Sequence, residues 1–292
     1  MDWILTIPSD FALDALLRRS EWLLLPPFAV NYAQGELHRV EHLRSGKVVT
    51  LTLSQALGGM HLRVNERLSG GETEEVSRKT WRMLRLGENF TSFLALARGD
   101  PTLSRCVRRG VRFLRGVTLF EDLVKALILG NSPRQWGSQR VAWIVDRLGD
   151  PLPSNPTRHA FPTPAQLLSH RHLVLEILGP ELGRNFLNVV EYFQSDEEQL
   201  EDLLQARHSL EEITATLNRL PSMSSCTLAL TMLALGRYDY LPINACARQG
   251  FDHGEQPPSS EPDRLRTAFE PWQPWGGLVY WLWDWSEGVP GE

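Results

Sequence analysis

Cysteine is scarce in this chain of 292 residues, and long apolar runs are missing from it. The three cysteines, Cys106, Cys226 and Cys246, are too few and too scattered for a disulfide framework, a four-cysteine zinc site or an iron–sulfur cluster. The longest uncharged apolar run covers residues 22–30, far short of the ~20 residues that a membrane span needs. The first residues have no basic segment ahead of an apolar core, unlike a secretory signal. We therefore expect a cytoplasmic protein that holds no metal and no other cofactor.

The short motifs of several enzyme classes are also missing. The sequence has no Gly-x-Gly-x-x-Gly loop, no phosphate-binding loop ending in Gly-Lys-Ser/Thr, no Gly-x-Ser-x-Gly elbow and no His-Glu-x-x-His pair. His38 and His42 have the spacing of one helix face, and His170 and His172 lie close together. Neither pair has a third ligand nearby, so exposed histidines explain them better than a metal site.

Charge is spread unevenly along the chain. The formal net charge of −5 argues mildly against a nucleic-acid-binding protein. Between Arg105 and Arg147, however, nine basic side chains accompany three acidic ones, a local charge of +6 that leaves −11 elsewhere. One interpretation is a basic surface that holds a polyanion. The other is a solvated helix face whose counter-charges come from elsewhere in the fold.

The hydrophobic period changes along the chain. Residues 1–80 contain one short helical segment, 9–18, and are otherwise rich in β-branched and alternating residues that predict strands. Ser69-Gly-Gly71 indicates a turn or linker, and Thr163-Pro-Ala-Gln166 and Ser209-Leu-Glu-Glu212 resemble helix starts. The segments with helical i, i+3, i+4 spacing are 84–97, 101–110, 118–130, 135–148, 164–178, 183–194, 197–205, 209–219 and 225–236. We predict an α+β fold, with a small antiparallel β-sheet domain at 1–80 and a helical domain at 81–292.

The most informative pattern runs over residues 217–248. A helix ends, a tight turn follows at Pro221-Ser-Met-Ser224, and an apolar helix begins near Ser225. The loop Gly236-Arg-Tyr-Asp239 then leads to a segment that contains Asn244. This arrangement resembles the helix-hairpin-helix of the DNA glycosylases of base excision repair.

Other segments resemble the same superfamily, in the same order along the chain. They are Arg112-Phe-Leu-Arg115, 119–130, Ala160-Phe-Pro-Thr-Pro164, Leu182-Gly-Arg184 and the tryptophan-rich 280–285. The N-terminal β segment is similar to the extra domain of the 3-methyladenine DNA glycosylase II branch. The resemblance therefore implies a two-lobed, all-α domain of the glycosylase type, with its hairpin at about 209–236.

The resemblance also implies which residues meet DNA. The hairpin residues are Pro221, Ser222, Met223, Ser224 and Thr227. The DNA-facing loop consists of Asn131, Ser132, Pro133, Arg134 and Trp136. It has no bulky apolar side chain at the position from which the family enters the duplex; Trp136 or Pro133 is the substitute, and a loop followed by a helix start is the simpler interpretation of Ser132-Pro133. The implied partner is double-stranded DNA, damaged or intact. We expect a monomer that binds no membrane and that is associated with the nucleoid if it binds DNA.

Ten tryptophans, five of them between Trp272 and Trp285, offer aromatic walls for a flipped base. The candidates for a base pocket are Phe120, Trp272, Trp281 and Trp285. Trp281 and Trp285 have the i, i+4 spacing of one helix face. The alternative is that the tryptophans pack the lobe that holds the termini together.

The sequence departs from the glycosylase pattern at the positions that carry its function. Ser222 and Ser224 replace two glycines, which let the turn reach positive φ and bring backbone N–H groups against a DNA phosphate. A serine donates the same backbone N–H but tolerates positive φ less well. Cys226 stands where bifunctional relatives place the lysine that forms a Schiff base, so we expect no lyase step.

Asn244 stands where the superfamily places its catalytic aspartate. The resemblance implies that this carboxylate stabilises a sugar with oxocarbenium-like charge or orients water, and asparagine has neither its charge nor its basicity. Asp239 and Asp252 are nearby in sequence, but a helix cap and a surface acid describe them better than replacement catalysts.

Three functions stay open at this point. The first is a monofunctional, weakened glycosylase for alkylated purines, whose cationic bases are already good leaving groups. The second is a catalytically silent protein that binds DNA or damage, and the third is a scaffold that no longer binds DNA.

Overall fold

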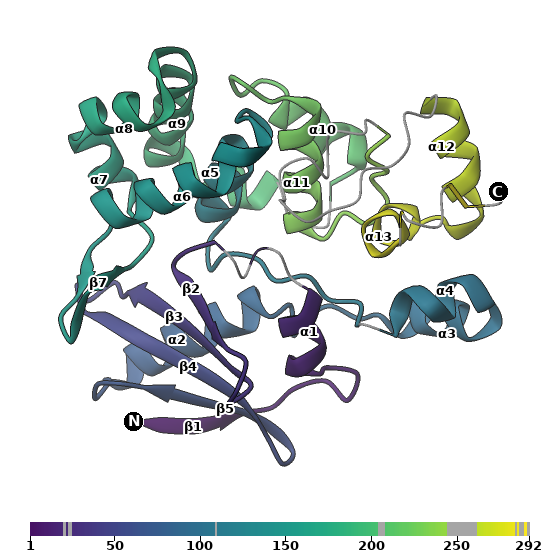
Figure 1. The fold of residues 1–292 in the computed structure, drawn as a ribbon, viewed down its shortest axis with the longest axis horizontal. Coiled ribbons are helices and arrows are strands. Elements are labelled where there is room, and N and C mark those ends of the chain that lie inside the picture. The colour runs from purple at the N-terminus through teal and green to yellow at the C-terminus, as the bar shows by residue number, and fades with distance from the viewer. Residues whose placement is uncertain are drawn as a thin grey trace.

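The computed structural model describes residues 1–19, 22, 25–108, 110–203, 208–243, 262–283, 285, 289 and 290 (Figure 1). The N-terminal part is a five-stranded sheet in the order β1-β5-β4-β3-β2, with every neighbouring pair antiparallel. Its strands are β1 Asp2–Leu5, β2 Phe28–Asn31, β3 Glu36–His42, β4 Val48–Ala56 and β5 Gly59–Val64. Successive side chains of a strand point to opposite faces of the sheet, and every second residue from Val49 to Leu53 of β4, the longest strand, is apolar. Val49, Leu51 and Leu53 therefore share one face, and all three are fully buried.

Two helices accompany the sheet, α1 Leu13–Arg19 and α2 Gly70–Met83. Ser69 caps α2 through a capping box, in which its hydroxyl accepts from the Glu72 N–H and the Glu72 carboxylate accepts from the Ser69 N–H. Gly70 and Gly71 therefore belong to the first turn of a helix, and the predicted turn or linker at Ser69–Gly71 is wrong.

The rest of the described chain is mainly helical and forms two groups (Figure 1). One group contains α5 Leu119–Gly130, α6 Arg134–Leu148, α7 Pro164–Ser169, α8 Arg171–Leu178, α9 Pro180–Leu203, α10 Leu210–Leu217 and α11 Ser225–Leu235. The other contains α3 Thr91–Gly99, α4 Pro101–Val107, α12 Pro262–Phe269, the 3₁₀ turn η3 Glu270–Trp272 and α13 Gly276–Leu282. A sheet followed by helices confirms the predicted α+β class.

Several predicted boundaries are wrong, for identifiable reasons. The helix expected at 84–97 begins only at Thr91, because Arg85 has φ +56° and ends the preceding helix. The segment 164–178 is two helices separated at His170, whereas 183–194 and the described part of 197–205, up to Leu203, belong to the single helix α9. The short hairpin of β6 Pro151–Leu152 and β7 Asn155–His159 had no sequence signal. The described helices include none long and apolar enough to cross a bilayer.

A buried ion network joins the sheet to α5. Arg39 of β3 donates two hydrogen bonds to the Glu121 carboxylate, at 3.0 and 2.7 Å, and a third to Glu41 at 2.7 Å. Lys125, one turn after Glu121, donates to the same carboxylate at 2.7 Å. Arg39, Glu121 and Lys125 are each at most 1% exposed. The orientation of α5, whose far end reaches the candidate site, is therefore fixed against the sheet.

Candidate functional site

The turn between α10 and α11 is built by serine caps. Ser209 begins α10 with a capping box to Glu212, as the sequence predicted. Ser224 begins α11, and its hydroxyl accepts from the Thr227 N–H at 3.1 Å. The same hydroxyl donates to the Gly130 carbonyl at the end of α5, at 3.0 Å. Ser224, with φ −64°, thus serves as a helix cap and needs no glycine.

Ser222 has the unusual backbone of the turn. Its φ is +59°, in the left-handed region that favours glycine. The Ser224 N–H donates to the Ser222 carbonyl at 2.9 Å and closes the turn. Within the described part of the chain, the N–H groups of Ser222 and Met223 donate no hydrogen bond. A turn with two unused backbone donors just before a helix N-terminus is an arrangement that binds anions.

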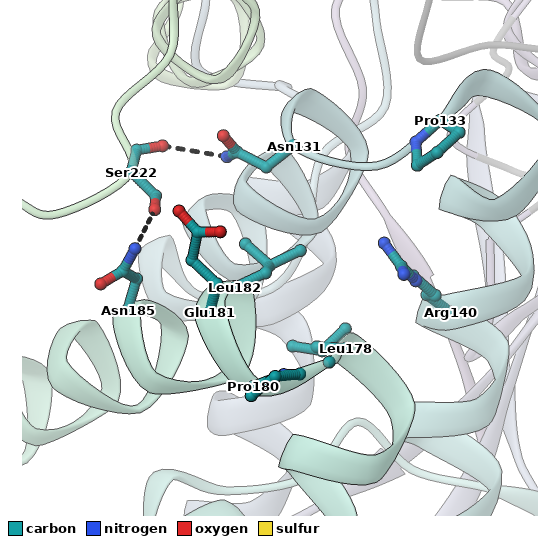
Figure 2. Close-up of a pocket in the computed structure, with 10 residues that line it drawn as sticks. Asn131, Pro133, Arg140, Leu178, Pro180, Glu181, Leu182, Asn185 and Ser222 are labelled. Atoms are coloured by element: carbon teal, nitrogen blue, oxygen red, sulfur yellow. Dashed lines mark hydrogen bonds between the residues drawn. The ribbon is translucent and has the colours of Figure 1, made fainter.

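Asn131 connects the end of α5 to this turn. Its side-chain Nδ2 lies 2.9 Å from the Ser222 carbonyl, 2.9 Å from the Leu127 carbonyl and 3.0 Å from the Thr227 hydroxyl (Figure 2). The helices α5 and α11 also approach closely here, because a Cβ on Gly130 would lie 2.6 Å from the Thr227 backbone nitrogen. The structure therefore brings the predicted hairpin and the first residue of the predicted loop together.

A pocket of about 530 Å³ lies beside the turn, where α5, α6, α8 and α9 meet it (Figure 2). It is lined by Asn131, Pro133, Arg140, Leu178, Gly179, Pro180, Glu181, Leu182, Asn185 and Ser222. Arg140 donates to the Ser132 hydroxyl at 2.9 Å, and Asn185 donates to the Ser222 hydroxyl at 2.8 Å. Glu181 adds an exposed carboxylate that disfavours an anion on that wall.

Sequence reasoning missed Arg140 and Asn185. The motif at Leu182-Gly-Arg184 was recognised, but nothing in it indicates that the next residue contacts the hairpin, 37 positions later. Only the packing of α9 against the turn brings the two together.

The basic segment 105–147 does not form one cationic surface. Arg112 is buried and pairs with Asp10 at 2.8 Å, Lys125 is buried in the ion network, and Arg147 pairs with Glu176 at 2.8 Å. Asp10 and Glu176, from outside the segment, and Glu121, from within it, thus neutralise these three members of the segment. Arg219, two positions before the turn, and Arg184, next to the Asn185 that contacts Ser222, are exposed and make no ion pair with any described residue.

The predicted DNA-facing loop places an aromatic ring at the surface. Trp136, in the first turn of α6, is 47% exposed, and its ring centroid lies 6.3 Å from that of Trp143. Pro133 is exposed and lines the pocket beside it. The side chain of Arg134 lies outside the described part of the structure.

The candidates for a base pocket fall into separate groups of ring contacts. Phe120 is buried in α5 against Phe161 and Phe193. The C-terminal tryptophans are also buried, and none of the four candidates lines the pocket beside the turn. Their contacts are Trp272 with Phe269 and Trp283, Trp281 with Tyr280, and Trp285 with Phe269 and Tyr280.

These contacts favour the packing interpretation of the C-terminal tryptophans. Trp272 also donates from Nε1 to the Asp100 carboxylate at 2.9 Å, which ties η3 to the start of α4. The expectation that Trp281 and Trp285 share a helix face is wrong, because α13 ends at Leu282 and Trp283 has extended backbone.

The loop after α11 leads toward position 244. Gly236 ends α11 with φ +76°, and the Asp239 carboxylate accepts from Arg237 at 3.0 and 2.5 Å. Both carboxylate oxygens of Asp239 are therefore engaged by Arg237. Asn244 and Asp252 lie outside the described residues.

Glu88 is a second carboxylate against this loop, and it accepts from Arg85 at 2.5 Å and from the Tyr238 hydroxyl at 2.6 Å. Burial opposes its ionisation, but Arg85 and Tyr238 outweigh burial and lower the pKa of Glu88. Cys226 is buried in the first turn of α11. The described residues contain no group of three or more His, Cys, Asp and Glu side chains placed to hold a metal ion.

No family model matches the sequence. A search of curated proteins finds no match either. Among solved structures, the 3-methyladenine DNA glycosylase from Archaeoglobus fulgidus is similar over 98% of both chains, with a TM-score of 0.73 and 20% identity. The 8-oxoguanine glycosylase/lyase of Clostridium acetobutylicum in its apo form has a TM-score of 0.67 and 17% identity, over 96% of this chain and 98% of that one.

The same Clostridium enzyme in complex with double-stranded DNA has a TM-score of 0.68 and 16% identity, over 97% of this chain and 95% of that one. At these identities the likeness concerns the fold. The chain therefore has the fold of solved DNA glycosylases, from its N-terminal sheet to its C-terminal helices.

Proposed function

We propose that this protein is a glycosylase-like protein of base excision repair that binds double-stranded DNA through the turn at 221–224 and the loop at 131–136. The observation that carries the proposal is the left-handed Ser222, with its unused N–H groups, in a fold similar to solved DNA glycosylases. One of those glycosylases was solved with double-stranded DNA.

The turn would hold a DNA phosphate. The N–H groups of Ser222 and Met223 supply two donors, and the positive end of the α11 dipole adds attraction for the negative charge. Arg219, two positions before the turn, and Arg184, next to the Asn185 that contacts Ser222, are exposed cations, and Arg140 is on the wall of the adjoining pocket. Few cations are engaged, so the affinity should be modest and should fall with salt.

Base excision, in this proposal, is hydrolytic and weak. Asparagine at position 244 removes the charge that would stabilise the sugar cation, a loss on the order of 10²–10³ in rate. Cys226 supplies no amine for a Schiff base, so no strand-cleaving lyase step follows. The favoured substrates are purines alkylated at N3 or N7, because their cationic bases leave with least assistance.

The decisive experiment uses duplex DNA methylated at purines, with chromatography of the free 3-methyladenine and 7-methylguanine that the protein releases. The Asn244→Asp variant is assayed in parallel. We expect release close to the spontaneous rate from the unaltered protein and an increase of about 10²-fold in the variant. Robust turnover by the unaltered protein would contradict the weakened site, and silence from both proteins would contradict the glycosylase assignment.

The alternative candidate is a catalytically silent protein that binds DNA or damaged DNA. The paired replacements at Asn244 and Cys226 favour it, because they remove both catalytic groups of the pattern and leave the turn formed. Binding that falls steeply with salt, without release from either protein, would support this alternative. Absence of binding at low salt would leave the scaffold function that the acidic net charge permits.

A further inference from the structure

Two asparagine side chains from different helical elements meet at Ser222 (Figure 2). Asn131, directly after α5, donates from Nδ2 to the Ser222 carbonyl oxygen at 2.9 Å. Asn185, in the second turn of α9, donates from Nδ2 to the Ser222 hydroxyl oxygen at 2.8 Å. Within the described turn, Ser222 is the only residue whose carbonyl and side chain both accept a hydrogen bond from an asparagine. It is also the residue with φ +59°.

A left-handed backbone is costly for serine. Steric repulsion between Cβ and the carbonyl disfavours it by roughly a factor of ten relative to the ordinary regions, a penalty that glycine escapes. A strained residue keeps such a conformation only when its surroundings impose it. Here the surroundings that contact Ser222 with polar atoms are the two asparagine amides and the Ser224 N–H.

Both amides are themselves anchored. The Asn131 amide also reaches the Leu127 carbonyl and the Thr227 hydroxyl, so α5 and α11 fix its direction. Asn185 is part of a regular helix and is half-buried. The Asn131 amide therefore opposes relaxation of the turn, and the hydrogen bond from Asn185 adds a second restraint from α9.

We propose that Asn131 and Asn185 are positioning residues that hold Ser222 in the left-handed conformation, in place of the freedom that glycine has, and so keep the N–H groups of Ser222 and Met223 directed at a phosphate. This inference rests on the proposed function, since its consequence is measured as DNA affinity. The statement about φ of Ser222 concerns the turn alone and does not depend on DNA binding. We call the two amides with Ser222 the amide latch.

The test compares Asn131→Ala and Asn185→Ala, each with serine and with glycine at position 222, by fluorescence anisotropy on a labelled duplex. With serine, each alanine should weaken binding about fivefold to tenfold, the worth of one buried hydrogen bond. With Ser222→Gly, Asn185→Ala should change affinity less than about twofold, because glycine reaches positive φ without help. Asn131→Ala, which also alters the proposed DNA-facing loop, should lose less affinity with glycine than with serine. Asn188→Ala is the control: it lies on the same helix, is exposed and donates no side-chain hydrogen bond to a described residue.

Rescue by glycine separates positioning from general support of the fold. Urea unfolding of the same proteins gives the stability of each variant. Equal losses of affinity in the serine and glycine backgrounds, or losses that simply follow stability, would overturn the amide latch. Rescue by glycine in proteins of equal stability would support it.

A crystal structure of the Asn131→Ala/Asn185→Ala double variant distinguishes failure of the latch from failure of the proposed function. Negative φ at Ser222 in that variant supports the latch, and φ near +60° overturns it, whether or not DNA binds. Failure of the unaltered protein to bind duplex DNA at low salt refutes the proposed function instead.

Discussion

Replacing Glu121 with glutamine removes a buried negative charge that Arg39 and Lys125 share. The change keeps the size of the side chain and one oxygen acceptor, so packing is nearly preserved. Arg39 retains Glu41 as a partner, whereas Lys125 is left facing a neutral amide with the rings of Phe28 and Phe161 around it, at 5.0 and 5.4 Å. Rings attract a cation, but far less than a carboxylate does in such a site.

The magnitude follows from this uncompensated charge. Breaking a buried ion pair from one side typically costs about 3–5 kcal/mol of unfolding free energy. The lysine can instead fold as a neutral amine, which costs about 5 kcal/mol at pH 7 from an ordinary pKa of ~10.4. This second route limits the loss, so we expect the Glu121→Gln protein to lose about 3–5 kcal/mol. Glu176→Gln, which breaks the exposed pair with Arg147, should lose about 1 kcal/mol or less.

Urea unfolding followed by tryptophan fluorescence measures both variants, and its pH dependence identifies the mechanism. Burial already lowers the pKa of Lys125 in the unaltered protein, and the loss of Glu121 lowers it further. The unfolded chain then binds more protons than the folded one, so stability of the variant should rise with pH, by up to about 1.4 kcal/mol per pH unit, until Lys125 of the unfolded chain also deprotonates. A loss below about 1 kcal/mol, with no such rise, would refute our account of the network.

Three further predictions concern the surface and the helix ends. Gly130→Ala should push α5 from α11 and weaken DNA binding about tenfold or more, whereas Gly99→Ala, with open space around it, should have no effect on binding. Trp136→Ala should weaken duplex binding by about fivefold or more, since stacking on a base is worth ~1–3 kcal/mol, while the equally exposed Trp81→Ala should not. Glu72→Gln should make stability less sensitive to acid between pH 4.5 and about 2.

The sign of the last prediction follows from the cap of α2. Hydrogen bonds from Lys47, Ser45 and the Ser69 N–H lower the pKa of Glu72 to about 2, from 4.5. Its stabilisation is complete above the unfolded pKa and is lost as the pH falls through the folded value. Unfolding measured across this range gives the comparison, and equal acid sensitivity of both proteins would contradict it. For the other two, losses of binding that the control variants match would contradict the assigned contacts.

Local sequence signals predicted where helices and strands occur better than they predicted the residues at which each one begins and ends. The capping sequences at Thr163 and Ser209 begin helices as predicted, because a cap is specified by residues three positions apart. The β-branched and alternating residues of 1–80 likewise indicated strands in that region, but they did not give the bounds of each strand. The break at left-handed Arg85 had no local signal, and the Arg85 guanidinium donates to the Ala234 carbonyl of α11, 149 positions away.

In the candidate site, too, local sequence patterns predicted some features and contacts between distant residues determine the others. The turn at 221–224 was found by its resemblance to a known hairpin, and the resemblance predicted strain where serine replaces glycine. It did not predict that the two serines take different roles, with Ser222 left-handed and Ser224 as a helix cap. Ser222 is contacted by Asn131 and Asn185, and Ser224 contacts Gly130, and tertiary packing brings these distant residues to the turn.

The absence of a side chain at Gly130 has a mechanical consequence. With backbone almost against backbone at this point, the end of α5 and the start of α11 have no room to slide, and Asn131 pins them further. We therefore expect the turn at 221–224 and the loop that begins at Asn131 to keep a fixed distance from each other. In the proposed complex the DNA, rather than the protein, then has to bend. We therefore expect higher affinity for flexible base steps and for damaged, poorly stacked sites than for stiff, intact DNA.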